Sequence, residues 1–159
     1  MTDPQPQEVQ EVQEALVTDP QLLAAQEALV QAITAGGPLP PGFDEGGVRA
    51  AARSILLKRA GEVGRAWPVL AESYGTDWQE TFVAWAADRP TKGSIRDAWD
   101  FARAHRSELK PAAARELAFT EMRWHYDGES EPRPRRFAVR FLGTGLAVQL
   151  RGRVRFVGR

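Results

Sequence analysis

The chain has 159 residues, of which 43% are hydrophobic, and it contains no cysteine. This length suits one domain, or one domain with a small appendage. The lack of cysteine excludes disulfides, a thiolate nucleophile and thiolate metal sites. The acidic N-terminus has no apolar core of the kind a secretory signal needs, and no apolar run reaches the roughly 20 residues of a membrane helix. We therefore expect a cytoplasmic protein with no membrane partner.

The net charge of zero conceals an uneven distribution of charge along the chain. Residues 1–48 contain eight acidic residues and no Lys or Arg, whereas residues 132–159 contain eight Arg and no acidic residue. The stretch between them, residues 49–131, carries 13 residues of each sign. This asymmetry predicts either a contact between the two ends or an anionic partner for the basic end.

Apolar periodicity predicts a helical domain over residues 20–126, after an acidic and loosely ordered lead at residues 1–19. Asp19 before Pro20 is typical of a helix start, because the Asp side chain accepts from free amides while Pro has no amide to satisfy. The expected helices span about 20–35, 46–65, 69–74, 94–106 and 111–124. A further helix is expected to start at residue 76 and to end before a loop at residues 88–93.

Two further helix starts follow from spacing. Thr76 with Gln79, and Ser94 with Asp97, match the capping-box pattern, in which a hydroxyl and a side chain three residues later satisfy each other's amides. Asp97 and Asp100 lie three residues apart on one helix, and we interpret them as solvated charges.

The same periodicity assigns large side chains to the core. Trp78, Phe82 and Trp85 share one helical face, and we expect Phe43 to fix the preceding turn-rich segment onto the core. Placement in the core, in preference to a base-stacking platform, is expected for all five tryptophans: Trp67, Trp78, Trp85, Trp99 and Trp124.

Residues 127–135 form a hydrophilic connector, after which the apolar period changes to two over residues 136–159. With a hairpin-type turn at Gly143-Thr144-Gly145, this indicates two or three antiparallel strands. The expected fold is mainly α, a compact helical bundle of about five to six helices with a short C-terminal antiparallel β-hairpin or three-stranded ribbon. Because a lone hairpin is marginal in water, the ribbon should dock on the helices or on another chain.

The sequence holds no pattern typical of catalysis. His105 and His125 are well separated, and we interpret them as surface residues rather than metal ligands. No serine lies in a Gly-x-Ser-x-Gly turn, and no glycine-rich phosphate loop opens a helix. We therefore expect a protein that is not an enzyme, with no catalytic residue, no metal and no cofactor.

The Arg-rich ribbon is the remaining candidate for function. Arginines on an edge strand can simply protect it from aggregation. They can also contact nucleic-acid phosphates, or attract an acidic peptide that adds as a further strand. The candidate peptide- or partner-binding residues are Arg136, Phe137, Val139, Arg140, Phe141, Arg151, Arg153 and Arg155.

Residues 26–124 carry a pattern that resembles known proteins. It consists of residues 26–33, GGPLPPGFD (36–44), LLKR (56–59), WPVL (67–70), WQETFVAWA (78–86), RPTKGS (89–94), DAWDFAR (97–103) and ARELAFTEMRW (114–124). The pattern resembles a small actinobacterial helical family. More distantly, it resembles the N-terminal helical domain, labelled DNA-binding, of partner proteins of multinuclear non-heme iron oxidases. Those oxidases modify ribosomally made peptides in methanobactin-type and thiaglutamate-type pathways.

The resemblance implies an accessory protein in peptide natural product biosynthesis. Its partners would be a multinuclear non-heme iron oxidase and a precursor peptide, which it would bind and present for modification. The iron ligands of such systems lie on the oxidase, and no binding residue is transferred to this chain.

Two other interpretations stay open. A DNA-binding or regulatory protein would use the Arg-rich ribbon on phosphates, although a near-neutral isoelectric point and the acidic N-terminal residues weigh against it. A structural dimer would pair through the ribbon, and the sequence leaves the oligomeric state undecided.

Overall fold

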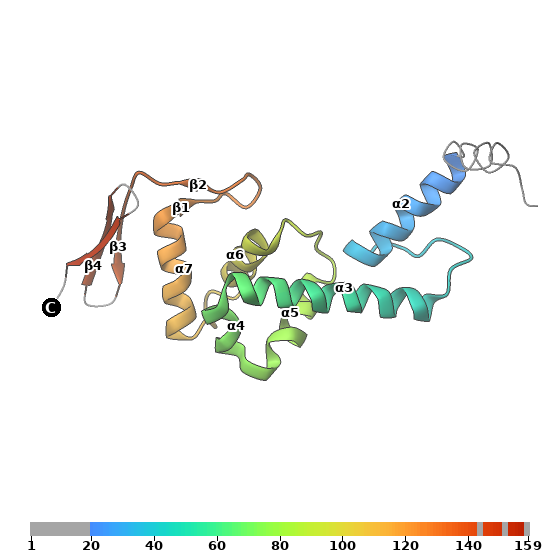
Figure 1. The fold of residues 1–159 in the computed structure, drawn as a ribbon, viewed down its shortest axis with the longest axis horizontal. Helices are drawn as coiled ribbons and strands as arrows, with labels where there is room; N and C mark the ends of the chain where they lie inside the picture. The colour runs from blue at the N-terminus through green and yellow to red at the C-terminus, as the bar shows by residue number, and fades with distance from the viewer. Residues whose placement is uncertain (1–19, 143–144, 151–152, 158–159) are drawn as a thin grey trace, which may run out of the picture. The chain divides into compact units, whose positions relative to one another are not determined.

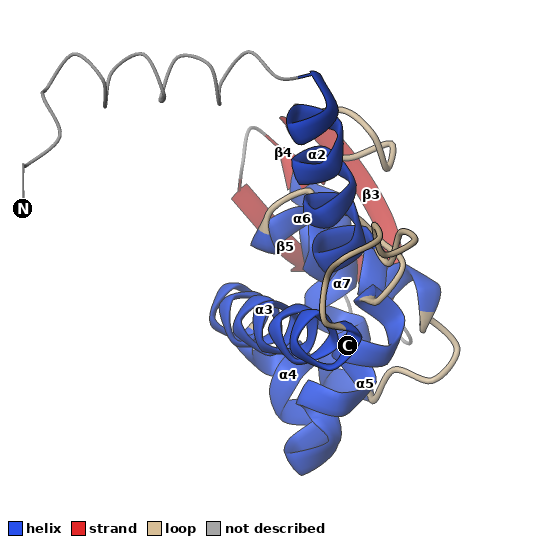
Figure 2. Ribbon diagram, turned by 90° about the vertical axis from the view of Figure 1, so that its right-hand side faces the viewer, coloured by secondary structure: helices blue, strands red, loops and turns tan. Residues whose placement is uncertain are grey.

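The computed structural model describes residues 20–142, 145–150 and 153–157 (Figure 1). Its helices are α2 (Pro20–Ala35), α3 (Glu45–Ala66), α4 (Pro68–Tyr74), α5 (Trp78–Ala86), α6 (Ser94–Ala104) and α7 (Pro111–Arg123), with a 3-10 turn η1 (Gly75–Asp77). Its strands are β1 (Trp124–His125), β2 (Arg133–Pro134), β3 (Phe137–Leu142), β4 (Gly145–Leu150) and β5 (Arg153–Val157). Helices make up most of the described chain and the strands lie at its C-terminal end (Figure 2), which confirms the predicted mainly helical class with a three-stranded antiparallel ribbon.

The chain divides into two compact units. Of the described residues, 20–58 and 83–90 form the first unit, and 59–82, 91–142, 145–150 and 153–157 form the second. Helices α3 and α5 each contribute residues to both units, whereas α4, α6, α7 and all the strands belong to the second unit.

In the first unit, α2 begins at Pro20, in agreement with the helix start expected there, while Asp19 lies outside the described residues. None of the α2 residues is buried. The chain turns after α2 at Gly36, where φ is +69° and an added Cβ would lie 3.0 Å from the Ala87 carbonyl oxygen. Glycine is therefore required there, because other residues would be strained in both backbone and contact.

The segment that leads into α3 corrects one expectation. Phe43 is 42% exposed, so its predicted contact with the core is wrong. The local fixing point is Asp44 instead, whose carboxylate accepts a hydrogen bond of 2.5 Å from the Gly47 amide in the first turn of α3. This side-chain cap fixes the end of the turn-rich segment to the start of α3.

Aromatic side chains form the core of the second unit. The Phe101 ring centroid lies 5.3 Å from that of Trp78, 5.7 Å from that of Phe82 and 5.5 Å from that of Tyr74. The indole Nε1 of Trp78 donates to the Ala60 carbonyl oxygen at 3.1 Å, which satisfies the polar atom of a buried ring.

The tryptophans do not all lie in the core. Trp67, Trp78 and Trp99 are buried as predicted and Trp85 is half-buried, but Trp124 is 40% exposed. Trp124 follows the last residue of α7, and its backbone is extended, with φ −127° and ψ 147°. Its side chain therefore does not continue the buried face of the helix, and the prediction for this residue is wrong.

Helix α4 is held at its N-terminal end by a side chain from α7. Its N-cap residue, Trp67, makes no side-chain cap. Glu116 Oε2 instead accepts from the Leu70 amide at 2.7 Å, one of the amides that a helix leaves without an internal partner. Burial raises the pKa of Glu116, while hydrogen bonds from the amides of Leu70 and Val69 act in the opposite direction.

The two expected capping boxes are not formed. Thr76 lies within η1, before α5 begins, and its hydroxyl makes no cap. Ser94 is the first residue of α6 rather than its N-cap, which is Gly93. In a capping box Asp97 would accept from the amide of Ser94. Its carboxylate instead accepts from the Lys92 amide, two residues earlier, at 2.9 Å.

The ribbon is an antiparallel sheet of order β3-β4-β5 whose strand β3 contacts α7. Gln149 is fully buried, and its Nε2 donates to the Arg135 carbonyl oxygen at 2.9 Å. Phe137 pairs in register with Leu150, and both side chains are exposed, as is that of Val139. The sheet thus keeps an exposed apolar face. Of the expected hairpin turn, Gly143 and Thr144 lie outside the described residues.

The segment expected to be a plain connector, residues 127–135, contains β2, which forms a second, two-stranded sheet with β1. Strand β1 pairs with β2 antiparallel, with Trp124 opposite Pro134 and His125 opposite Arg133. The Arg135 amide extends the pairing by donating to the Arg123 carbonyl oxygen at 2.8 Å. This pairing brings the chain back beside the end of α7 before the ribbon starts.

Candidate functional site

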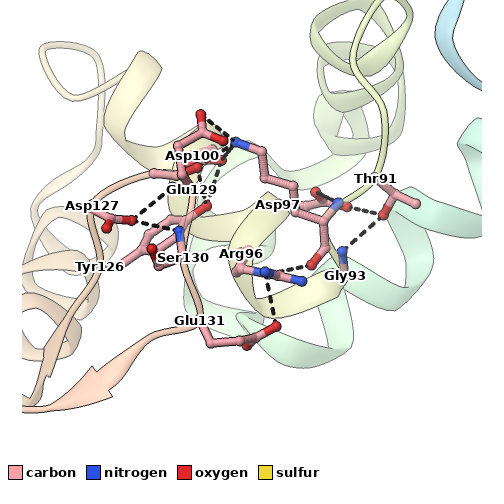
Figure 3. Close-up of polar contacts among 12 residues, drawn as sticks. Thr91, Gly93, Arg96, Asp97, Asp100, Tyr126, Asp127, Glu129, Ser130 and Glu131 are labelled. Carbon is pink, nitrogen blue, oxygen red and sulfur yellow. Dashed lines mark hydrogen bonds and ion pairs between the residues drawn. The ribbon is translucent and has the colours of Figure 1, made fainter.

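A polar network fixes the loop between β1 and β2 onto α6 (Figure 3). The Tyr126 hydroxyl donates to Asp100 Oδ2 at 3.0 Å, and Lys92 Nζ lies 3.2 Å from the same oxygen. Lys92 also donates to the Gly128 carbonyl oxygen. Burial and the Asp100 carboxylate both raise the pKa of Tyr126, so the phenol stays protonated as a donor. Asp100 is thus partly buried and bonded, and its interpretation as a solvated charge is wrong.

The far side of the same loop is fixed by three other contacts (Figure 3). The Asp127 carboxylate accepts from the amides of Glu129 and Ser130 at 2.9 and 2.8 Å, and these bonds lower its pKa to about 2. Arg96 Nη1 then lies 3.0 Å from Glu131 Oε1, which joins the loop to α6. The loop therefore forms a fixed wall next to the start of α6.

Lys92 also connects this network with a buried ion pair. Arg59 Nε lies 2.7 Å from Asp97 Oδ2, the Thr91 hydroxyl donates to the same oxygen at 2.7 Å, and Asp97 is 2% exposed. The interpretation of Asp97 as a solvated helix charge is therefore wrong. The reason is tertiary, since the 91–93 loop and the end of α3 cover its face of α6.

Next to this wall, the second unit has a hollow of about 610 Å³. It lies between the end of α3, the start of α6, the end of α7 and the wall. Its lining includes the buried rings of Trp67 and Trp99 and the exposed side chains of Ile95 and Trp124. Its size is in the range of binding pockets, and its walls are mainly apolar.

Two further hollows adjoin the first. One, of about 440 Å³, lies between α4 and α7, and the other, of about 620 Å³, lies between the end of α7 and the exposed sheet face. Trp124 lines all three hollows. We call the three together the Trp124 surface. Its exposed large apolar side chains are Val69, Ile95, Trp124, Phe137 and Leu150.

The charges on the Trp124 surface are mostly positive. Arg115, Arg123 and Arg136 line it and form no ion pair within the described part of the chain. The acidic residues in its lining already have partners, since Glu116 caps α4 and Glu131 pairs with Arg96, which lines the same hollow. The unpaired charges of the surface are therefore cationic.

The structure separates the ribbon residues that the sequence put forward. Arg136 and Phe137 line the Trp124 surface, whereas Val139 lies in another hollow, of about 400 Å³, beside α7. Arg155 is exposed on β5, opposite Val148 in register. The backbone places Arg140 and Phe141 on β3 and Arg153 on β5, and Arg151 lies outside the described residues.

Sequence reasoning missed the centre of this surface. Trp124 is expected in the core in preference to a base-stacking platform, and the sequence patterns do not single out Ile95 or Arg123 for binding. One signal was available for Trp124, because it stands at the boundary between a helical period and the hydrophilic connector. A large aromatic residue at a helix end is less constrained to the core than one in mid-helix.

The described residues show no group of three or more His, Cys, Asp or Glu side chains that could hold a metal ion. His105 Nδ1 lies 2.9 Å from the Phe101 carbonyl oxygen and His125 is exposed, so the two histidines have separate surroundings. In the same part of the chain, no helix combines the length and the apolar character needed to span a bilayer.

Comparison with known proteins finds a relative of greater length. The UPF0276 protein of Streptomyces avermitilis is 40% identical over 82 residues, which are 51% of this chain and 17% of that protein. The match therefore covers about one sixth of the relative's length. No solved structure matches the chain.

A family model described as SCO6045-like, C-terminal domain, matches residues 23–107. These residues run from within α2 to beyond the end of α6, and they include Lys92, Ile95 and Arg96. The matched region is more than half of the 159 residues, and the chain belongs to the SCO6045-like, C-terminal domain family.

Proposed function

We propose that this chain is a non-catalytic partner protein that binds a ribosomally made precursor peptide, an iron-dependent modifying oxidase, or both, and presents the peptide for modification. The sequence motifs at residues 26–124, which resemble partner proteins of such oxidases, motivate the choice of partner. The partner oxidase would modify the peptide, and this chain would bind and present it.

One observation carries the proposal. The second unit exposes aromatic and aliphatic side chains next to arginines that have no ion-pair partner among the described residues, on a surface made of three adjoining hollows. Exposed apolar area grouped in this way is typical of protein- or peptide-binding surfaces, which are rich in Trp and Arg. Such a surface suits binding, and it requires no reactive group.

The Streptomyces avermitilis relative supports the proposal indirectly. Its similar region is a minor part of a much longer chain, so a domain of this kind is joined there to a large further part. A domain joined to another part of a chain makes interfaces like those between separate proteins. We infer that the oxidase partner of this chain corresponds in kind to that further part.

The test uses the whole chain. It is co-expressed with the iron-dependent oxidase encoded nearest to its own gene, and the purified protein is titrated calorimetrically with that oxidase and with its precursor peptide. We expect a stable complex with the oxidase or heat from peptide binding. Absence of both at concentrations on the order of tens of micromolar would defeat the proposal.

The Arg-rich C-terminal end favours a second candidate, a DNA-binding or regulatory protein, because eight Arg lie in residues 132–159. Phosphate binding makes affinity fall steeply with salt concentration. A titration with duplex DNA at low and moderate salt decides between the two functions, and a flat or absent signal at low salt rules out the second.

A further inference from the structure

We propose that the Trp124 surface is the docking site for an acidic, extended peptide segment with spaced aromatic or aliphatic side chains. This inference rests on the proposed function and names the surface and the kind of peptide involved. The apolar side chains of the segment would enter the hollows on either side of Trp124, and its carboxylates would meet the arginines between them.

The arrangement of the hollows supports an extended chain. The hollow at the start of α6 and the hollow beside the exposed sheet face meet at Trp124, which lines both. The third hollow, along α7, shares Thr120 with the first and Arg123 with the second. Separate hollows with a common ridge suit alternate side chains of one extended strand, since residues two apart point in the same direction.

The exposed side chains supply the apolar contacts. Ile95 is 57% exposed and Phe137 is 61% exposed, and they lie in different hollows on the two sides of Trp124. Large side chains left this accessible gain most from a partner that covers them, because burial of apolar area is the main favourable term in association. Trp124 touches every hollow and is the expected energetic centre.

Charge determines the preferred peptide. Arg115, Arg123 and Arg136 have no acidic partner among the described residues, so an incoming carboxylate would not have to displace an existing ion pair. Complementary charge raises the association rate and discriminates against basic segments. The surface should therefore select acidic over basic peptides with the same apolar residues.

The surface is less suited to nucleic acid. Phosphate tracking needs a continuous cationic groove, whereas here Glu116 and Glu131 stand in the lining and apolar side chains occupy the hollows. Stacking of a base on Trp124 remains the way in which a single strand would bind. A single-stranded oligonucleotide is accordingly included in the test.

The experiment uses the full chain and its own fluorescence. Trp124 is 40% exposed, whereas Trp85 is half-buried and the other three tryptophans are buried, so acrylamide quenching reports most strongly on Trp124. The probe is a synthetic Glu-rich peptide with spaced Phe residues. Two matched peptides carry Lys in place of Glu, or Ser in place of Phe. We expect the acidic Phe peptide to reduce quenching and to bind at least about tenfold more tightly than either control peptide.

Variants locate the site. Trp124→Ala should weaken binding of the acidic Phe peptide, followed by the anisotropy of a label on the peptide, by about thirtyfold, the loss typical of a central aromatic contact. Arg123→Glu should weaken it by about tenfold. Lys58→Glu, which reverses an exposed cation outside all three hollows, should leave the affinity within about twofold. Circular dichroism spectra of the variants confirm that each is folded.

The outcomes separate this inference from the proposed function. Peptide binding that survives both Trp124→Ala and Arg123→Glu overturns the docking site, as does absence of binding by the acidic Phe peptide, or tighter binding of the oligonucleotide. Co-purification with the oxidase in any of these cases would leave the proposed function standing. Loss of oxidase and precursor binding, with the synthetic peptide still bound at Trp124, would instead defeat the proposed function alone.

Discussion

Asp97 is the residue at which burial and charge conflict most directly. Its carboxylate is buried with the Arg59 guanidinium and also accepts from the Thr91 hydroxyl and the Lys92 amide. Removal of one partner from a buried ion pair leaves the other charged and poorly solvated, which is far more costly than loss of an exposed pair. The pair therefore acts mainly as a constraint on how α3 and α6 pack, since each charge must lie opposite its partner.

We expect Asp97→Ala to reduce the free energy of unfolding by about 3–5 kcal/mol, measured by urea denaturation. Asp97→Asn keeps an acceptor for the Lys92 amide and should cost less. A double-mutant cycle with Arg59→Met isolates the ionic part of the effect. If Asp97→Ala costs no more than an exposed charge does, about 1 kcal/mol or less, the pair is not buried in solution.

At the scale of the element, α4 shows how a short helix is fixed by its neighbour. A helix of seven residues is too short to be stable alone, and its local N-cap residue makes no side-chain bond. Glu116 of α7 provides the acceptor for the Leu70 amide. The element therefore depends on a carboxylate that is distant in sequence and partly buried.

This carboxylate predicts a dependence of stability on pH. Burial raises the pKa of Glu116 above its ordinary value of 4.5, so the folded state holds the proton more tightly than the unfolded state. Stability from this group is greatest below 4.5 and falls as the pH rises through the raised pKa. In urea unfolding followed across this pH range, Glu116→Gln should lose that fall and become relatively more stable as the pH rises.

Glu116→Ala serves as the matched control because it removes the acceptor altogether. The Leu70 amide then has no partner, and we expect Glu116→Ala to be less stable than Glu116→Gln by about 1 kcal/mol at any pH in the range, because neither variant titrates at this position. Equal effects of the Gln and Ala variants at every pH would contradict the capping role of this side chain.

At the scale of the whole molecule, the two units differ in how much of their helices is buried. No residue of α2 is buried, whereas five residues of α6 are buried: Asp97, Ala98, Trp99, Phe101 and Ala102. Stability within one protein is uneven, and segments with few buried contacts open without global unfolding. The buried core therefore lies mainly in the second unit.

We expect native-state hydrogen exchange to show this difference. Amides of α2 should exchange through low-energy local openings, and the central amides of α6 and α7 only at the free energy of global unfolding. Mass spectrometry of peptic fragments over a denaturant series measures both. Equal protection of α2 and α6 would show that α2 is covered by a partner, for example a second copy of the chain.

Much of the helical part follows from local sequence alone. Pro20 and Pro111 start α2 and α7, and Trp78 and Phe82 lie on the buried face that their spacing indicates. The change of period after residue 135 also marks the three strands correctly. These features are predictable because backbone sterics and side-chain spacing act within a few residues.

The candidate site depends on contacts that local patterns cannot encode. Arg59 and Asp97 are buried because segments 38 residues apart meet, and Trp124 is exposed because β1 pairs with β2 instead of extending α7. The sequence by itself determined the helical class, the Arg-rich ribbon and the absence of cysteine chemistry. Only the tertiary structure decided which charges are paired and which aromatic side chain is left open, since both depend on which distant segments cover each face.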